Sequence, residues 1–225
     1  QELRLKITKK CEFTSIDEGY IEITEFIKND NLKRFITKFK EYIYKNVKLT
    51  CSVGIGFSKV SAKIASDLNK PNGYFIFKDK EHFLEYIYDK DLSIIPGIGK
   101  KTRELLSLFN IKKVSELYKI EKSDLIKKFG NKRGLYLYNV IRGLHFSEIE
   151  NNRKRHSYGH EVTFNQDIND SKELENELRM QSKKLSKRLE KTKEYAKTVT
   201  LKIRYSNFET YTKSKTLKIS TRDWE

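Results

Sequence analysis

Pro96-Gly97-Ile98-Gly99-Lys100 follows closely on Asp91, where the chain changes from an α/β pattern to a series of short helices. Proline and two glycines break the backbone, and apolar residues at helical spacing resume directly afterwards. Such a turn between two short helices is the sequence signature of a helix-hairpin-helix. Its glycines would leave backbone N–H groups uncovered at a helix N-terminus, where they can hold a DNA phosphate.

The residues of this turn are therefore candidates for DNA contact. They are Gly97, Ile98, Gly99, Lys100 and Lys101. The lysines would add charge without reading the base sequence. A P-loop is rejected, because the glycine that it requires five residues before Gly99 is Ile94. A plain turn between two packed helices remains the alternative.

Upstream of the turn, strands and helices alternate. Apolar spacing predicts helices over residues 29–46 and 58–69, and strands over residues 49–55 and 74–77. This order indicates an α/β sheet domain over residues 1–90.

The turn itself belongs to residues 91–150, which predict a small all-α domain with helices over 100–109, 114–117, 123–129 and 134–141. A polar linker over 151–155 follows. Beyond it, the pattern predicts a strand over 158–164, a long leucine-bearing helix, and strands over 199–205 and 210–219. This β-α-β-β order, open at its end, predicts a third domain over residues 151–225. The expected fold class is therefore a multidomain α+β protein.

Residues 14–20 read Thr-Ser-Ile-Asp-Glu-Gly-Tyr, so two carboxylates, Asp17 and Glu18, close a strand-like segment. Acidic residues are disfavoured in strands. The two can converge if the strand ends or bulges there, and Gly19 permits this. In a basic chain, such a pair suggests a divalent cation held against a phosphate. A hairpin turn with a solvated acidic pair is the alternative interpretation.

The formal net charge is +16, and Lys and Arg exceed Asp and Glu in each of the three segments. A spread excess is typical of a chain that contacts nucleic acid with several domains, although a lysine-rich proteome would give the same charge. No apolar run approaches the roughly 20 residues of a membrane span. Cys11 and Cys51 form no Cys-x-x-Cys motif, so we expect a cytoplasmic protein without membrane contact.

Residues 62–73 read Ala-Lys-Ile-Ala-Ser-Asp-Leu-Asn-Lys-Pro-Asn-Gly and place Lys70 at a helix end. Taken in order, the acidic segment, Ser-Val-Gly-Ile-Gly at 52–56, this segment and Ile-Pro-Gly-Ile-Gly-Lys closely resemble the Y-family translesion DNA polymerases. The DNA polymerase IV (DinB) branch fits best. Residues 156–164 continue the match, looking like the first strand of that family's little-finger domain.

The resemblance implies a role for each matching residue. Asp17 matches the family's second metal-binding aspartate and Glu18 the adjacent catalytic glutamate, so two Mg²⁺ ions are expected in the intact active site. Lys70 matches the lysine that contacts the triphosphate of the incoming dNTP. Residues 1–90 match part of a ferredoxin-like palm, residues 91–150 the thumb, and residues 151–225 an incomplete little finger. Candidate phosphate contacts in the linker and little finger are Arg153, Lys154, Arg155 and Ser157.

The resemblance also implies missing parts. The family's first metal-binding aspartate, its fingers domain, the end of the little finger and the tail that binds the sliding clamp have no counterpart here. We therefore expect a fragment that binds DNA weakly and does not polymerise. Its intact parent would be a monomeric, error-prone polymerase that extends primer-template DNA at the bacterial nucleoid. The competing hypotheses are a non-enzymatic helix-hairpin-helix DNA-binding module and a metal-dependent nuclease.

Overall fold

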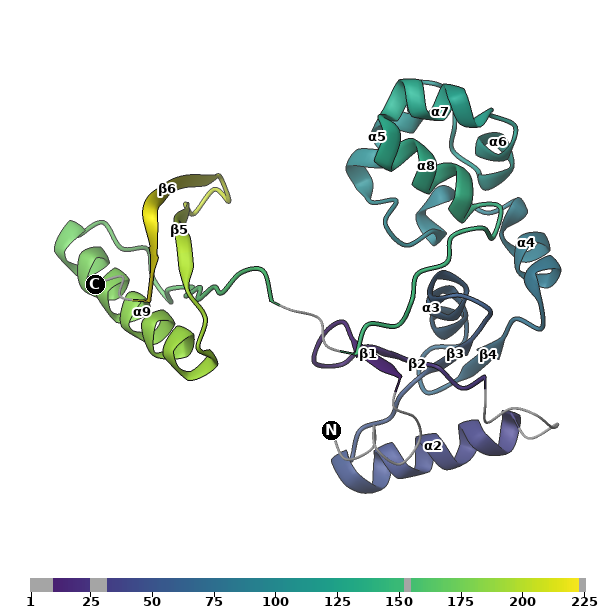
Figure 1. Cartoon of the computed structure of the whole chain (residues 1–225), viewed down its shortest axis with the longest axis horizontal. Helices are drawn as coiled ribbons and strands as arrows, with labels where there is room; N and C mark the ends of the chain where they lie inside the picture. Colours follow the sequence, from purple (N-terminus) through teal and green to yellow (C-terminus); the bar gives the residue numbers. More distant parts are fainter. Residues whose placement is uncertain (1–9, 25–31, 152–154, 223–225) are drawn as a thin grey trace. The chain divides into compact units, whose positions relative to one another are not determined.

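The computed structural model describes residues 10–24, 32–151 and 155–222 (Figure 1). The chain divides into two compact units, residues 1–153 and 154–225. Among the described residues, the first unit combines helices with two two-stranded sheets, and the second combines a long helix with one two-stranded sheet. This arrangement confirms the expected α+β class. Among the described residues, no helix is both long enough and apolar enough to cross a membrane.

The first unit begins with a short antiparallel hairpin. β1 (Cys11–Phe13) pairs with β2 (Gly19–Ile21). The carbonyl oxygen of Glu18 closes the turn between them, because it accepts from the N–H groups of Thr14 at 3.0 Å and Ser15 at 3.3 Å. The acidic pair therefore stands on a hairpin turn.

A parallel β-α-β unit follows α2 (Leu32–Val47). β3 (Val53–Ile55) pairs with β4 (Tyr74–Ile76), and α3 (Lys59–Leu68) connects them. Helix α3 lies very close to β3, since a Cβ atom on Gly54 would overlap the helix backbone at Ala62. The side chain of Ser58 caps the helix start by accepting from the N–H group of Ser61.

The remaining helices of the first unit share one hydrophobic core with α3 and β4. They are α4 (Lys80–Tyr88), the short 3₁₀ helix η1 (Leu92–Ile94), α5 (Lys100–Ser107), α6 (Val114–Tyr118), α7 (Lys122–Phe129) and α8 (Asn131–Val140). The core runs from Ile64 through Phe83 to Ile141. A palm ending at residue 90 and a thumb starting at 91 therefore remain a prediction within this unit.

The expected start of α8 was wrong by three residues, because the helix begins at Asn131 and not at Gly134. Gly134 interrupts the apolar pattern, yet it lies inside the helix. A Cβ atom at this position would lie 2.5 Å from the carbonyl oxygen of Leu125 in α7. The glycine thus allows α7 and α8 to pack closely.

The second unit consists of a long helix and a hairpin. α9 (Ser171–Thr192) begins at Asp170, whose carboxylate caps it by accepting from the N–H group of Lys172 at 2.7 Å. β5 (Ala196–Arg204) pairs with β6 (Thr210–Thr221) in antiparallel register.

The strand expected over residues 158–164 is not formed, and that prediction was wrong. A strand requires a neighbour for its backbone hydrogen bonds. In the described part of this unit, β5 and β6 pair only with each other. Residues 158–164 instead run as irregular chain, and Glu161 reaches the hairpin through an ion pair with Lys202 at 2.8 Å.

Candidate active site

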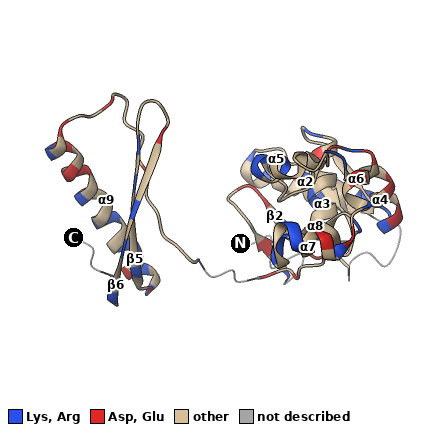
Figure 2. Ribbon diagram, turned by 90° about the horizontal axis from the view of Figure 1, so that it is seen from above, with Lys and Arg blue, Asp and Glu red and all other residues tan. Residues whose placement is uncertain are grey.

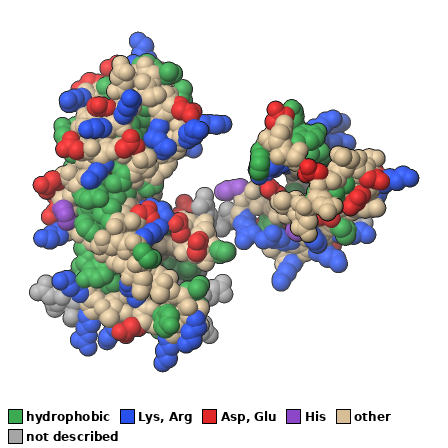
Figure 3. All heavy atoms as spheres, turned by 180° about the vertical axis from the view of Figure 1, so that it is seen from behind, with side chains coloured by type: hydrophobic (Ala, Val, Ile, Leu, Met, Phe, Trp, Pro, Cys, Tyr) green, Lys and Arg blue, Asp and Glu red, His purple; other side chains and the backbone are tan. Residues whose placement is uncertain are grey.

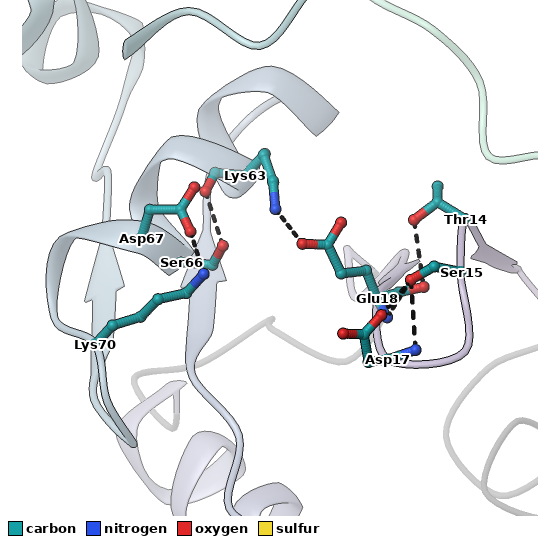
Figure 4. Close-up of polar contacts among 8 residues, drawn as sticks. All are labelled: Thr14, Ser15, Asp17, Glu18, Lys63, Ser66, Asp67 and Lys70. Carbon is teal, nitrogen blue, oxygen red and sulfur yellow. Dashed lines mark hydrogen bonds and ion pairs between the residues drawn. The ribbon is translucent and has the colours of Figure 1, made fainter. Parts of the chain in front are cut away.

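The carboxylate of Asp17 is exposed and bonded within its own turn (Figure 4). The hydroxyl of Ser15 donates to Asp17 Oδ1, and Ser15 Oγ accepts from the N–H group of Glu18 at 3.0 Å. The hydrogen bond from Ser15 is the main reason that the pKa of Asp17 is lowered. Asp17 therefore presents an ionised oxygen ligand to solvent at neutral pH.

Glu18 points out of the turn toward α3, where its carboxylate forms an ion pair with the ammonium group of Lys63 (Figure 4). The two side chains are 49% and 27% exposed. The hydrogen bond to Glu18 is the largest of the effects that raise the pKa of Lys63. This pair joins two parts of the site that lie 45 residues apart in the sequence.

Lys70 lies just beyond the end of α3, where its ammonium group pairs with Asp67 (Figure 4). The charges of Lys63 and Lys70 also lower the pKa of Asp17, after the larger effect of Ser15. Both ammonium groups are thus near enough to the acidic turn to act on the charge of Asp17. The structure brings the predicted residues Asp17, Glu18 and Lys70 into one neighbourhood.

Sequence reasoning did not identify Lys63 and Asp67 as members of this site. Lys63 and Lys70 are seven residues apart, which is close to two helical turns. That spacing predicts a shared face and could have pointed to Lys63.

The donor set of the acidic turn suits a hard cation. Mg²⁺ is usually held by one or two carboxylates together with water and substrate phosphates. Asp17 and Glu18 supply two such carboxylates. Within the described ranges, no cluster of three or more His, Cys, Asp or Glu side chains could hold a metal ion. The residues therefore fit an ion that takes its other ligands from elsewhere, such as a substrate phosphate.

The helix-hairpin-helix turn lies between η1 and α5. Gly97 has a positive φ of 85°. Gly99 is the N-cap of α5, and a Cβ atom added to it would meet no described atom within 4 Å. No side chain caps α5, so Lys100 and Lys101 begin a helix with an open N-terminus. The side chain of Ile98 is only 2% exposed, so this residue could contact DNA only through its backbone.

Tyr136 of α8 supports this turn from the inside. Its hydroxyl donates a hydrogen bond to the carbonyl oxygen of Pro96, and it lies 3.0 Å from the place of a Cβ atom on Gly97. Burial raises the pKa of Tyr136. No local signal marks this residue, because it is 40 residues from Pro96 in the sequence.

Of the four predicted phosphate contacts in the linker and little finger, Arg153 and Lys154 lie outside the described residues. Ser157 is exposed. The guanidinium group of Arg155 lies 5.9 Å from the ring centre of Tyr158, a cation–π arrangement that leaves the side chain at the surface. All four remain predictions.

One face of the β5–β6 hairpin carries hydroxyl and basic side chains, which sequence reasoning missed. The register places Thr198 opposite Thr216, Thr200 opposite Ser214, Lys202 opposite Thr212 and Arg204 opposite Thr210. Hydroxyl contacts of 2.9 Å (Thr198–Thr216) and 2.7 Å (Thr200–Ser214) order this face. The alternation of Thr, Lys and Arg along β5 was the available signal.

Lys and Arg are spread over both compact units (Figures 2 and 3).

Comparison with known proteins gives the same assignment along the chain. Residues 1–67 match the impB/mucB/samB family, and residues 155–225 match the C-terminal domain of that family. Residues 93–145, which contain the helix-hairpin-helix turn, match the thumb domain of DNA polymerase iota. The chain belongs to the Y-family (impB/mucB/samB) polymerases.

Individual Y-family relatives match almost the whole chain. DNA polymerase IV of Fusobacterium nucleatum is 47% identical over 98% of this chain and 63% of its own length. DNA polymerase IV of Staphylococcus aureus is 36% identical over 97% of this chain and 66% of its own length. The chain thus spans a little under two thirds of these relatives.

Solved Y-family structures share the fold. A Y-family DNA polymerase chimera aligns with a TM-score of 0.81 at 25% identity, over 97% of this chain and 63% of the chimera. DinB from Sulfolobus solfataricus aligns with a TM-score of 0.60 at 25% identity, again over 97% and 63%. An insertion ternary complex of Dbh DNA polymerase aligns with a TM-score of 0.62 at 24% identity, over 96% and 62%.

Proposed function

We propose that this chain is the larger part of an error-prone translesion DNA polymerase that adds dNTPs to a primer 3′-OH. The observation that carries the proposal is that the carboxylates of the acidic turn and the ammonium group of Lys70 lie in one neighbourhood. Asp17 and Glu18 offer oxygen ligands from the β1–β2 turn, and Lys70 offers a cation from the end of the helix (Figure 4). Nucleotidyl transfer needs both, a metal site and a group that binds the triphosphate.

Asp17 and Glu18 would hold Mg²⁺ in this polymerase. We expect two Mg²⁺ ions per active site. When bound, they would stabilise the charge on the attacking and leaving oxygens. Lys70 would bind the triphosphate. To do so, its ammonium group would leave the carboxylate of Asp67 and pair with phosphate oxygens. An exposed ion pair such as Lys70–Asp67 is weak, so this exchange costs little.

The DNA backbone would be held by two surfaces. In the first unit, the open N-terminus of α5 and its two lysines suit a phosphate. In the second unit, the hydroxyl and basic face of β5–β6 offers donors to further phosphates, with Arg204 as its main cation. The excess positive charge of both units supports this assignment. A sliding clamp remains an expected partner of the intact parent, which we propose acts as a monomer at the bacterial nucleoid.

The alternative is a DNA-binding module in which the acidic turn has no catalytic role. Nucleotide binding distinguishes the two, because only the polymerase uses Lys70 for a triphosphate. In the intact parent bound to primer-template DNA with Mg²⁺, a fluorescent dNTP should bind at least tenfold more weakly after Lys70→Ala. Lys78→Ala, which removes another exposed lysine eight residues away, is the control and should change little. Equal binding by the wild type and Lys70→Ala would favour the module.

A further inference from the structure

The ion pair between Lys63 and Glu18 has a consequence for metal binding. Glu18 is proposed as a metal ligand, yet its carboxylate is already occupied by an ammonium group. Lys63 sits on α3, and the neighbouring residues Ile64 and Ala65 are buried in the core of the first unit. The helix therefore holds the base of Lys63 in place, and only its flexible side chain can move.

A divalent cation and an ammonium group compete for the same carboxylate. Both are attracted to Glu18, and they repel each other at the few ångströms that separate two ligands of one carboxyl group. Binding of a metal ion at Glu18 therefore disfavours Lys63 in its present position. Asp67 is the next acceptor for Lys63, because it lies one turn further along α3 and its charge also raises the pKa of Lys63.

We propose that Lys63 is a positioning residue that fills the metal site in the metal-free state and transfers from Glu18 to Asp67 when a divalent cation binds. This inference rests on the proposed function, since it takes Glu18 to be a metal ligand. The two carboxylate oxygens of Asp67 can accept Lys63 beside Lys70, and they are freed further when Lys70 turns to the triphosphate, so metal binding and nucleotide binding would favour each other. The three carboxylates and two lysines then exchange partners without leaving any charge unpaired.

Mn²⁺ binding to the chain itself tests this, measured by the loss of the free-ion EPR signal without DNA and nucleotide, at protein concentrations high enough to register an ion held by two carboxylates alone. Lys63→Met removes the competing charge and should bind Mn²⁺ about three- to tenfold more tightly than the wild type. Lys63→Arg keeps the charge and should bind no more tightly than the wild type. Lys184→Met removes an exposed lysine of α9 and should change the affinity less than twofold. A gain in affinity cannot arise from misfolding, which would only weaken the site.

Glu18→Gln separates failure of this inference from failure of the metal site. If wild type and Lys63→Met bind equally well and both lose binding with Glu18→Gln, the role of Lys63 is overturned and the metal site stands. If neither shows Mn²⁺ binding that depends on Glu18, both proposals are overturned.

The transfer to Asp67 is tested by a double-mutant cycle. Asp67→Asn should weaken Mn²⁺ binding in the wild type, because Lys63 then has no second acceptor. In the Lys63→Met background the same change should have a clearly smaller effect. Equal weakening in both backgrounds would indicate a general electrostatic effect and overturn the transfer.

Discussion

The ammonium group of Lys59 lies 2.7 Å from the carboxylate of Glu12 and 2.7 Å from the carbonyl oxygen of Glu148. Glu12 is 7% exposed and also accepts from the N–H group of Glu150 at 3.0 Å. The pair thus ties α3 to β1, which leads into the acidic turn, and both to the chain that follows α8. These contacts fix the two sides of the site relative to each other.

Loss of this buried pair should destabilise the first unit. Glu12→Ala leaves the ammonium group of Lys59 without its buried partner, and we expect the free energy of unfolding to fall by about 3 kcal/mol. Glu22→Ala is the matched control, because its pair with Lys10 is exposed; it should cost less than about 1 kcal/mol. Urea unfolding followed by circular dichroism measures both. Equal losses would contradict a special role for Glu12.

The close approach of α3 to β3 leaves no room for a side chain at residue 54. Gly54→Ala places a methyl group against the backbone of Ala62, so we expect a loss of about 3 kcal/mol or a failure to fold. Gly99→Ala adds the same methyl group in open space and should change stability by less than about 1 kcal/mol. Thermal unfolding of the two variants provides the comparison. A Gly54→Ala variant as stable as Gly99→Ala is incompatible with this packing.

The hydrogen bond from Tyr136 to Pro96 should stabilise the helix-hairpin-helix turn. Tyr136→Phe removes it and should lower the free energy of unfolding by about 1 kcal/mol below pH 9. Burial raises the pKa of Tyr136 in the folded protein above its value in the unfolded chain, about 10. The stability that the neutral Tyr136 hydroxyl contributes is therefore fully present below about pH 10 and is lost as the pH rises through the folded pKa. The difference between wild type and Tyr136→Phe should therefore shrink above pH 10. A difference that stays constant or grows there would refute this assignment.

The start of α5 should contribute to DNA affinity through charge. Replacing Lys100 and Lys101 together by alanine should weaken binding to any DNA sequence, and should reduce the slope of log K against log salt by about 1–2. The control variant replaces Lys33 and Lys38, two exposed lysines of α2, and removes the same charge. Fluorescence anisotropy with a primer-template duplex at several salt concentrations measures both. Identical slopes for the two variants would exclude α5 as a phosphate contact.

Much of the fold follows from local pattern. The apolar spacing within α3, α5 and α9 predicted these helices, although α3 buries Ser61, Ile64 and Ala65 whereas α5 and α9 bury only Leu106 and Leu189. The prediction of a strand over 158–164 was wrong for a non-local reason, because an alternating pattern does not ensure that a partner strand is present.

The site shows the same division between local and distant information. Asp17, Glu18 and Lys70 could be named because motifs of fixed spacing contain them. The pairing of Lys63 with Glu18 could not, since it depends on how the hairpin turn packs beside α3. The role of Tyr136 at Pro96 is hidden in the same way.

Above all, we propose that Asp17 and Glu18 form part of the metal site of a DNA polymerase. Primer extension by the intact parent tests it most directly, with Asp17→Ala compared with the wild type in the presence of Mg²⁺ and dNTPs. We expect extension to be abolished while affinity for primer-template DNA stays within about twofold, because the turn is proposed to bind metal and not DNA. Extension at the wild-type rate by Asp17→Ala would contradict it.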